Sequence, residues 1–195
     1  MRRRKQTLDF NRSHEKKRLN VPLIQEVIAW IIEIAIVLVL AFVLVYFLGL
    51  RTSVVGRSME PTLYSGDEIL VDRFLYKLID PKQDDIIVFL PNGNEKSHFY
   101  VKRVLAGPGD TVQIRNGIIY INGSAYAGEM EYSSITDEGI ASDPITLEQN
   151  EFFVIGDDPE NSEDSRFANI GSIKKEYIIG KVWFVVSPRS RMGFL

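Results

Sequence analysis

The distribution of apolar residues divides the chain into two unlike parts. Residues 34–50 form an uninterrupted apolar run, and residues 27–32 extend it on the other side of Glu33. At ~1.5 Å per residue, a helix over residues 27–50 is longer than the ~30 Å hydrocarbon core of a bilayer. The pattern therefore predicts one membrane-spanning helix, with Glu33 close enough to its basic end for the carboxylate to reach the interface.

From residue 69 onward, short runs rich in Val, Ile, Phe and Tyr alternate with Gly, Asn, Asp and Pro. Such runs are typical of β-strands, so the fold class is predicted to be mainly β. Asn116-Gly117 is a strong hairpin signal between two of the runs. Residues 124–148 are more polar and acidic, and we expect them to form a mobile excursion from the sheet. The clearest predicted strands cover residues 69–71, 86–89, 100–105, 112–114, 118–121, 152–155 and 181–186.

Charge is distributed unevenly along the chain. Residues 2–18 carry a net charge of +6, whereas residues 51–195 carry −7. Basic residues before a membrane span and few just after it place the N-terminus in the cytoplasm. We therefore expect a cytoplasmic basic tail over residues 1–26, a transmembrane anchor over 27–50 and an extracytoplasmic β domain over 51–195. The basic tail is interpreted as a topology signal, and no nucleic acid partner is expected.

The composition excludes several kinds of chemistry. The chain contains no cysteine, so the β domain has neither disulfides nor a thiol nucleophile. His14 and His98 are the two histidines of the chain, and they fall on opposite sides of the predicted anchor. This is not the ligand clustering that a protein metal site requires. We therefore expect no metal and no other cofactor.

A candidate nucleophile lies eight residues beyond the apolar run, at Ser58. It occurs in the segment Gly56-Arg57-Ser58-Met59-Glu60-Pro61-Thr62-Leu63. A strand followed by Gly, Ser and a Pro-braced turn can present a hydroxyl with its own backbone N–H beside it, as acyl transfer requires. The segment therefore indicates a serine nucleophile held near a membrane surface.

A serine nucleophile needs a base, and Lys102 is the better candidate. It lies in Tyr100-Val101-Lys102-Arg103-Val104, an apolar context that predicts a strand buried on both faces. A free lysine titrates near ~10.4, so this amine can act near neutral pH only if burial favours its neutral form. The residues alone leave two alternatives open: a structural lysine extending from a strand edge, and a triad based on His98, which shares the same strand face.

Four motifs occur in order along the chain: Gly56 to Leu63, Tyr100 to Val104, Pro108-Gly109-Asp110, and Gly156-Asp157 with Ser162-Glu163-Asp164-Ser165-Arg166. Together they resemble the type I signal peptidases, the membrane-bound Ser/Lys proteases that remove secretory leader peptides. The resemblance implies a β-sheet, partial-barrel catalytic domain with one N-terminal transmembrane helix, the single-span form common in Gram-positive bacteria. It also implies a serine endopeptidase that acts on secretory preproteins and has membrane lipid as its other partner.

The resemblance further implies a role for individual residues. Ser58 looks like the nucleophile that forms an acyl-enzyme, and Lys102 looks like the general base. Ser162 looks like the serine that orients the lysine amine by a hydrogen bond. Asp164 and Arg166 look like an ion pair that shapes the site from behind.

Two positions depart from the pattern of the family. Gly56 stands where some members carry a hydroxyl residue that contributes to the oxyanion hole. We therefore expect the backbone N–H groups of Ser58 and Gly56 to bind the oxyanion. Asp158 stands where the family usually has Asn, so the amide donor of that Asn is missing.

The substrate is expected to bind as an extended strand beside residues 52–56 and the strand that enters Lys102. Val54, Met59 and Val101 are the candidate pocket residues. Shallow apolar pockets favour small side chains such as Ala, and the resemblance implies this preference at −1 and −3 from the cut.

Two other functions are compatible with some of these features. The Ser/Lys self-cleaving proteases related to repressors share the catalytic pair, but the anchor and the absence of a DNA-binding helix pair argue against them. The alternative from a different class is a non-catalytic, membrane-anchored interaction module with a degenerate active site. Labelling of Ser58 by an acylating inhibitor distinguishes an enzyme from such a module.

Overall fold

The computed structural model describes residues 21–132 and 135–195. Most of the tail predicted for residues 1–26 lies outside the described residues. The chain divides into two compact units, with the boundary between Phe42 and Val43. The first unit holds most of the N-terminal helix, and the second holds the β domain.

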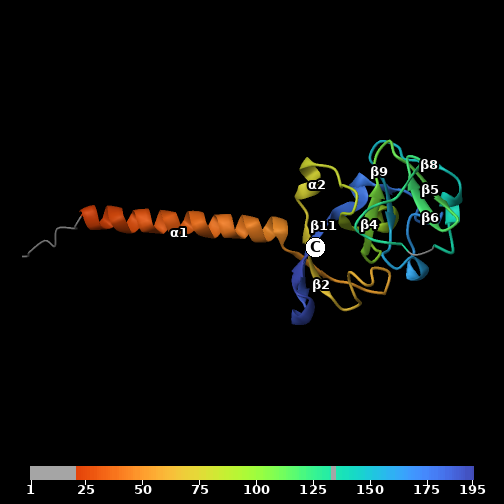
Figure 1. Cartoon of the computed structure of the whole chain (residues 1–195). Coiled ribbons are helices and arrows are strands. Elements are labelled where there is room, and N and C mark those ends of the chain that lie inside the picture. Colours follow the sequence, from red (N-terminus) through yellow and green to blue (C-terminus); the bar gives the residue numbers. More distant parts are fainter. Residues whose placement is uncertain (1–20, 133–134) are drawn as a thin grey trace, which may run out of the picture. The chain divides into compact units, whose positions relative to one another are not determined.

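The N-terminal helix, α1, covers Val21–Leu48 without interruption (Figure 1). Its segment Pro22–Leu44 has a mean hydropathy of 3.0 and is long and apolar enough to cross a membrane. The helix starts six residues before the predicted span, because Pro22 in the first turn is compatible with helix initiation. It ends before Gly49, where a helix loses stability, and the chain then enters β1.

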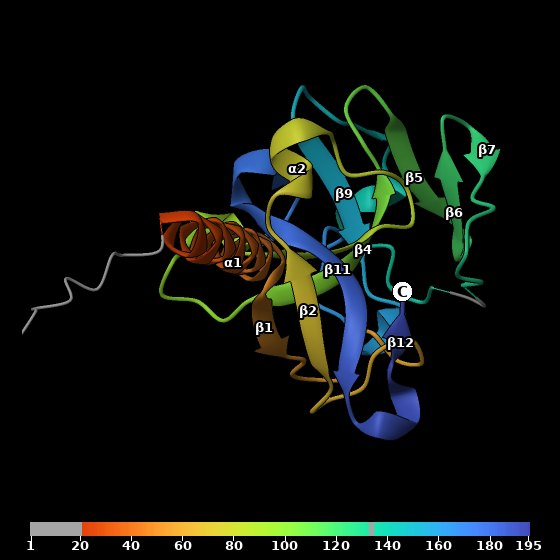
Figure 2. The ribbon, with the colours of Figure 1, turned by 90° about the vertical axis from the view of Figure 1, so that its left-hand side faces the viewer.

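The main sheet has the strand order β1-β2-β11-β3-β4-β9-β10, with β12 paired to β11, and all its neighbours are antiparallel. Register shifts interrupt the pairing of β11 with β2 and β3 and of β4 with β9. Such bulges bend strands and increase their twist, and the sheet curls accordingly (Figure 2). The strands are β1 (Leu50–Ser53), β2 (Glu68–Asp72), β3 (Ile86–Phe89), β4 (Tyr100–Ala106), β9 (Glu151–Ile155), β10 (Ile173–Lys174), β11 (Ile178–Ser187) and β12 (Gly193–Phe194).

A second sheet has the order β7-β6-β5-β8 and lies beside β4 and β9, away from β1 and β2 (Figure 2). Asn116 and Gly117 both have positive φ, as the two-residue turn between β5 and β6 requires, so the predicted hairpin is confirmed. The strands are β5 (Thr111–Arg115), β6 (Ile118–Ile121), β7 (Ser124–Ala125) and β8 (Ile145–Thr146).

The segment 124–148 is more integrated than its polar sequence suggests. It contributes β7 and β8 to the second sheet, so the interpretation of the whole segment as an excursion from the sheet is corrected. Ile135, Ala141 and Leu147 are buried in the same cluster as Phe153 of β9. A few well-placed apolar side chains are enough to anchor it, because burial of Ile135 and of Leu147 contributes about 1.5–3 kcal/mol each. Its mobility stays a prediction.

Short helical turns connect the strands: α2 (Leu75–Leu78), η1 (Pro91–Gly93), η2 (Gly139–Ser142), η3 (Pro159–Asn161), η4 (Lys175–Tyr177) and η5 (Arg189–Arg191). Each of the seven predicted strands lies within an observed one, so the prediction of a mainly β domain with one N-terminal apolar helix is confirmed. One core cluster joins Val54, Met59 and Leu63 to side chains of β2, β3, β4 and β11. This cluster fixes the loop that carries Ser58 against the main sheet.

Candidate active site

Ser58 lies on the loop between β1 and β2, which is anchored on both sides. Val54 donates its N–H to the Asp67 carbonyl at 2.8 Å, and its own carbonyl accepts the Gly66 N–H at 2.9 Å. Beyond Ser58, Met59 is 1% exposed and packs into the core. Gly56 has a φ of +89°, a backbone conformation that glycine adopts without strain. The loop therefore presents the half-buried Ser58 hydroxyl from a firmly held backbone.

Lys102 lies in β4, which pairs with β3 on one side and β9 on the other. Its side chain is not at a strand edge, and the residue is only 4% exposed. The Lys102 Nζ donates a hydrogen bond to Ser58 Oγ at 2.6 Å and lies 5.7 Å from the centre of the Tyr100 ring. Burial lowers the pKa of Lys102 to about 8, although the nearby Asp164 carboxylate acts in the opposite direction.

His98 is less well placed than Lys102 to contact Ser58. It is exposed, and it lines the same cavity as Ser58 and Lys102. Among the hydrogen bonds of the described residues, none joins His98 to either side chain. A triad needs a base within hydrogen-bond reach of the nucleophile, and in this structure Lys102 is the group that meets this condition.

Asp164 and Arg166 form the expected ion pair in the segment between η3 and β10. The Arg166 Nε donates to Asp164 Oδ1 at 2.8 Å and its Nη2 donates to Oδ2 at 3.0 Å, with both side chains almost fully buried. Arg166 also donates to the Asp137 carbonyl at 2.9 Å. These bonds satisfy the pair, which a buried charge requires.

Ser162 makes a different contact from the one predicted. Its hydroxyl donates to Asp164 Oδ2 at 2.6 Å. The described residues show no hydrogen bond between Ser162 and the Lys102 amine, which donates to Ser58 instead. The orientation of the amine by Ser162 therefore stays a prediction.

Gly156 and Asp158 connect the nucleophile to a second loop, residues 156–172, between β9 and β10. A Cβ atom at Gly156 would clash with the Ser162 hydroxyl and with the Ser58 carbonyl oxygen, so this position has no room for a side chain. The backbone N–H of Asp158 donates to the same Ser58 carbonyl at 3.0 Å. The Asp158 carboxylate accepts a hydrogen bond from the Asn161 amide at 2.8 Å. The backbone of Asp158 thus holds Ser58 in place, while the Asp158 side chain forms a hydrogen bond within its own loop.

Arg103 and Asp157 form a second buried ion pair, to which the sequence analysis assigned no role. Arg103 Nε and Nη2 donate to the two Asp157 oxygens at 2.8 and 2.7 Å. Arg103 also donates to the Asp84 carbonyl at 3.0 Å and to Thr62 Oγ1 at 3.3 Å. Both residues belong to motifs that the sequence singled out, next to Lys102 and Gly156. Their pairing links the nucleophile loop, β4 and the second loop.

A cavity of about 300 Å³ opens beside the Ser58 and Lys102 side chains. The three predicted pocket residues, Val54, Met59 and Val101, all line it, and all are buried. Among the described residues, the backbone N–H groups of Gly56 and Ser58 make no intramolecular hydrogen bond. The described residues also contain no cluster of three or more His, Cys, Asp or Glu that suits a metal ion. The chemistry available here is therefore that of a hydroxyl, an amine and backbone donors.

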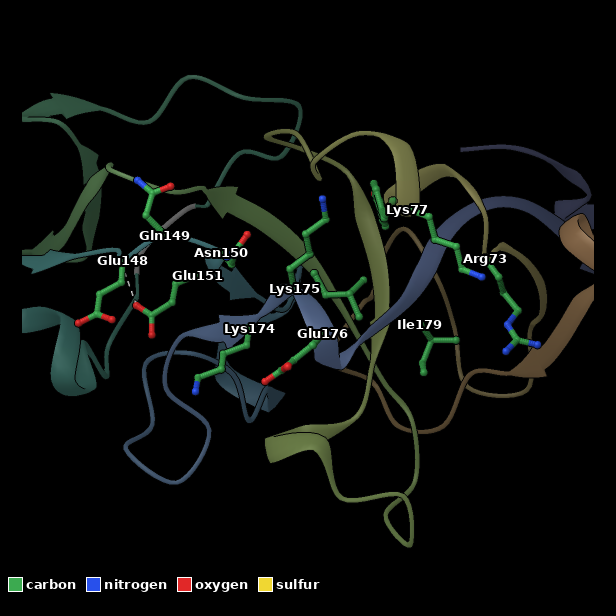
Figure 3. Close-up of a pocket in the computed structure, with 12 residues that line it drawn as sticks. Arg73, Lys77, Glu148, Gln149, Asn150, Glu151, Lys174, Lys175, Glu176 and Ile179 are labelled. Carbon is green, nitrogen blue, oxygen red and sulfur yellow. Dashed lines mark hydrogen bonds between the residues drawn. The ribbon is translucent and has the colours of Figure 1, made fainter.

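A larger cavity of about 850 Å³ lies elsewhere on the β domain, and neither Ser58 nor Lys102 lines it. Its walls carry both signs of charge, with Arg73 and Lys77 toward one end and Glu148 and Glu151 toward the other (Figure 3). Lys175, which lines this cavity, forms an ion pair with Asp80 at 2.5 Å. The size of a cavity therefore does not locate the candidate nucleophile in this protein.

The sequence of this chain is similar to those of known proteins. The sequence model of the family described as signal peptidase, peptidase S26, matches residues 27–187. Signal peptidase I P of Bacillus subtilis subsp. natto is 35% identical over 173 residues, which are 85% of this chain and 92% of that protein. Signal peptidase IB of Staphylococcus aureus is 30% identical over 187 residues, with 87% and 94% covered. A crystal structure of a signal peptidase I from Enterococcus faecalis is 26% identical, with a TM-score of 0.42, and the match covers 53% of this chain and 97% of that one.

Proposed function

The chain belongs to the signal peptidase family, peptidase S26, and we propose that it removes signal peptides from exported preproteins with Ser58 as nucleophile and Lys102 as general base. The relatives are signal peptidase I enzymes, which are serine endopeptidases, and this chain is one of them. The observation that carries the proposed mechanism is the 2.6 Å hydrogen bond between the Lys102 amine and the Ser58 hydroxyl. Burial of the Lys102 amine lowers its pKa to about 8.

Acylation begins when the neutral Lys102 amine takes the proton of Ser58 as Oγ attacks the scissile carbonyl carbon. The carbonyl oxygen becomes an oxyanion, and the free backbone N–H groups of Ser58 and Gly56 are the proposed donors to it. Lys102 then gives its proton to the leaving nitrogen, and the C–N bond breaks. The signal peptide is left as an ester of Ser58, and the mature protein departs with a new amino terminus.

Deacylation repeats these steps with water. Lys102 takes a proton from a water molecule, whose oxygen attacks the ester carbon. The same backbone donors stabilise the second tetrahedral intermediate. Lys102 returns the proton to Ser58 Oγ as the ester bond breaks, which releases the signal peptide and restores the enzyme.

Ser162 is proposed to orient the Lys102 amine. Because its hydroxyl hydrogen is directed to Asp164, the lone pairs of its oxygen remain available to accept a hydrogen bond from an amine. Arg166 is proposed to offset the negative charge of Asp164 near the Lys102 amine. Asp164 raises the pKa of Lys102 and Arg166 lowers it, so the ion pair keeps the carboxylate from holding the amine in its charged form.

The substrate is proposed to bind as an extended strand between residues 52–56 and β4. Val54, Met59 and Val101 then form the shallow apolar walls of the 300 Å³ cavity, which suits small side chains at −1 and −3. The apolar segment Pro22–Leu44 supports a single-pass anchor in the lipid bilayer. The basic residues that precede it support a cytoplasmic N-terminus with the catalytic domain, residues 51–195, outside. No nucleic acid partner is proposed.

The test is to incubate the full-length enzyme, solubilised in detergent, with a leader-bearing preprotein and to identify the new amino terminus. We expect cleavage after a small residue and covalent labelling of Ser58 by an acylating inhibitor. The Ser58→Ala variant should show neither. An intact preprotein, together with an unlabelled Ser58 in a folded enzyme, would favour a non-catalytic interaction module instead.

A further inference from the structure

Glu163 is an exposed carboxylate between two buried site residues. Ser162 and Asp164 are 6% and 0% exposed, whereas Glu163 faces solvent. The backbone at Ser162 is extended, with φ −121° and ψ 128°, so successive side chains point to opposite sides. Ser162 and Asp164 therefore turn inward, while Glu163 lines the cavity that contains Ser58 and Lys102.

The Glu163 carboxylate is held in place although it is exposed. Its Oε2 accepts a hydrogen bond from the Tyr100 hydroxyl at 3.0 Å, and its Oε1 accepts one from the Asn169 amide at 3.2 Å. Tyr100 in turn packs edge-on against Phe89, with ring centres 5.9 Å apart. A carboxylate has about four acceptor positions, and these two bonds leave positions free. A fixed anion with free acceptor positions can bind a cation or another donor from the substrate.

The charges around the cavity make Glu163 distinctive. Among the described residues that line the cavity, it is the one carboxylate. Of the Lys and Arg side chains there, Arg57 has its guanidinium 3.3 Å from Glu60, and Lys102 must be neutral when it acts as the base. The wall formed by Glu163 is therefore negative, next to the buried apolar side chains of Val54, Met59 and Val101.

We propose that Glu163 is a specificity-determining residue, which favours substrates with a Lys or Arg side chain close to the scissile bond and disfavours Asp or Glu at the same position. The proposal rests on the proposed function, because it assumes that the substrate occupies this cavity. The recognised group is an ammonium or guanidinium on the substrate. The small residues at −1 and −3 enter the apolar pockets, so the cation belongs to one of the other positions near the cut.

The experiment uses pairs of leader peptides that differ only by Lys or Glu, placed in turn at each position around the cut except −1 and −3. For the full-length enzyme in detergent, we expect a Lys-over-Glu preference in kcat/KM of roughly twofold to fivefold at one position or more, within the range for exposed ion pairs. The preference should shrink as ionic strength rises. Glu163→Gln should remove it, and Glu163→Lys should reverse it.

The matched control is Glu160→Gln, which removes the same charge from the same loop. The Glu160 carboxylate accepts hydrogen bonds from Thr136 and does not line the cavity, so the preference should persist in this variant. Tyr100→Phe keeps the ring and removes the hydroxyl that fixes Glu163, so it should weaken the preference. This second variant keeps the test decisive even if a change at Glu163 itself prevents folding.

If the wild-type enzyme cleaves the Lys and Glu peptides with equal kcat/KM at every position, the role of Glu163 is overturned and the proposed function stands. A preference that survives unchanged in folded Glu163→Gln would lead to the same conclusion. A wild-type enzyme that cleaves no leader peptide would refute the proposed function, and the role of Glu163 with it.

Discussion

Lowering the pH from 9 to 6 should reduce the catalytic efficiency of the enzyme by roughly ninetyfold, if Lys102 with a pKa of about 8 is the base. The physical reason is that only the neutral amine can accept the Ser58 proton. Acid protonates this amine, and the hydroxyl then loses its acceptor. Catalytic efficiency should therefore rise with pH through the pKa of Lys102 and level off above it.

The magnitude follows from the environment of the amine. Burial lowers the pKa of Lys102 from 10.5 to about 8, while Asp164, Glu163 and Asp157 raise it and Arg166 lowers it further. At pH 7 about one amine in ten is then neutral, compared with about three in ten thousand for an exposed lysine. Burial thus increases the fraction of active base about 300-fold, which is large enough to decide whether lysine can serve at neutral pH.

The assay measures kcat/KM for one leader peptide between about pH 5.5 and 9.5, at constant ionic strength, with the full-length enzyme in detergent. Below about pH 8, the logarithm of kcat/KM should fall by one unit for each unit by which the pH is lowered. His98→Ala should keep the same profile. Lys102→Arg should be inactive, because arginine stays charged at any workable pH. A midpoint near ~6.5 that disappears in His98→Ala, or substantial turnover by Lys102→Arg, would refute the reasoning.

Four further experiments test the Ser58–Lys102 pair, Ser162, the buried Asp164–Arg166 pair and the N-terminal anchor. Ser58→Ala and Lys102→Ala should each remove nearly all activity, and the double variant should be no worse, because nucleophile and base act as one unit; additive losses in single-turnover rates would contradict this. Ser162→Ala should reduce kcat while the melting temperature stays near that of the wild type, and full activity would refute its orienting role. Arg166→Ala should reduce both, since it leaves the buried Asp164 carboxylate unpaired at a cost of about 3–5 kcal/mol; an unchanged melting temperature would show that the pair is not needed for folding. A chain that begins near residue 50 should still cut free leader peptides but should process liposome-held preproteins poorly, because it loses the effective concentration that a shared membrane provides; an equal ratio of the two rates in both forms would show that the anchor does not contribute.

The elements that the sequence predicted well are those with a local signal. The runs at residues 86–89 and 118–121 are continuous apolar stretches between turn residues, and both are strands with those bounds. Asn116-Gly117 specifies its own turn, because both residues tolerate positive φ. The apolar neighbours of Lys102 likewise indicated a buried strand, which the structure contains.

The features that the sequence did not reveal depend on contacts between distant segments. Arg103 and Asp157 are separated by 54 residues, and no periodic pattern in the sequence predicts a buried ion pair between them. In residues 124–148, polar side chains outnumber the apolar anchors Ile135 and Leu147, which hides the packing of this segment. The hydroxyl of Ser162 has both Asp164 and Lys102 as possible partners, and which one it contacts depends on the bends of the loop rather than on residue types.

The hydrogen bond from the Asp158 N–H to the Ser58 carbonyl also bears on when the enzyme becomes active after synthesis. The ribosome makes Ser58 long before it makes the loop that follows β9, so a nascent chain carries its nucleophile without the groups that hold it. Contacts between such distant segments form late and slowly, because the intervening chain must first be ordered. Partly folded molecules are therefore poor proteases, and the appearance of activity during refolding should mark the last step of folding rather than the first formation of the sheet.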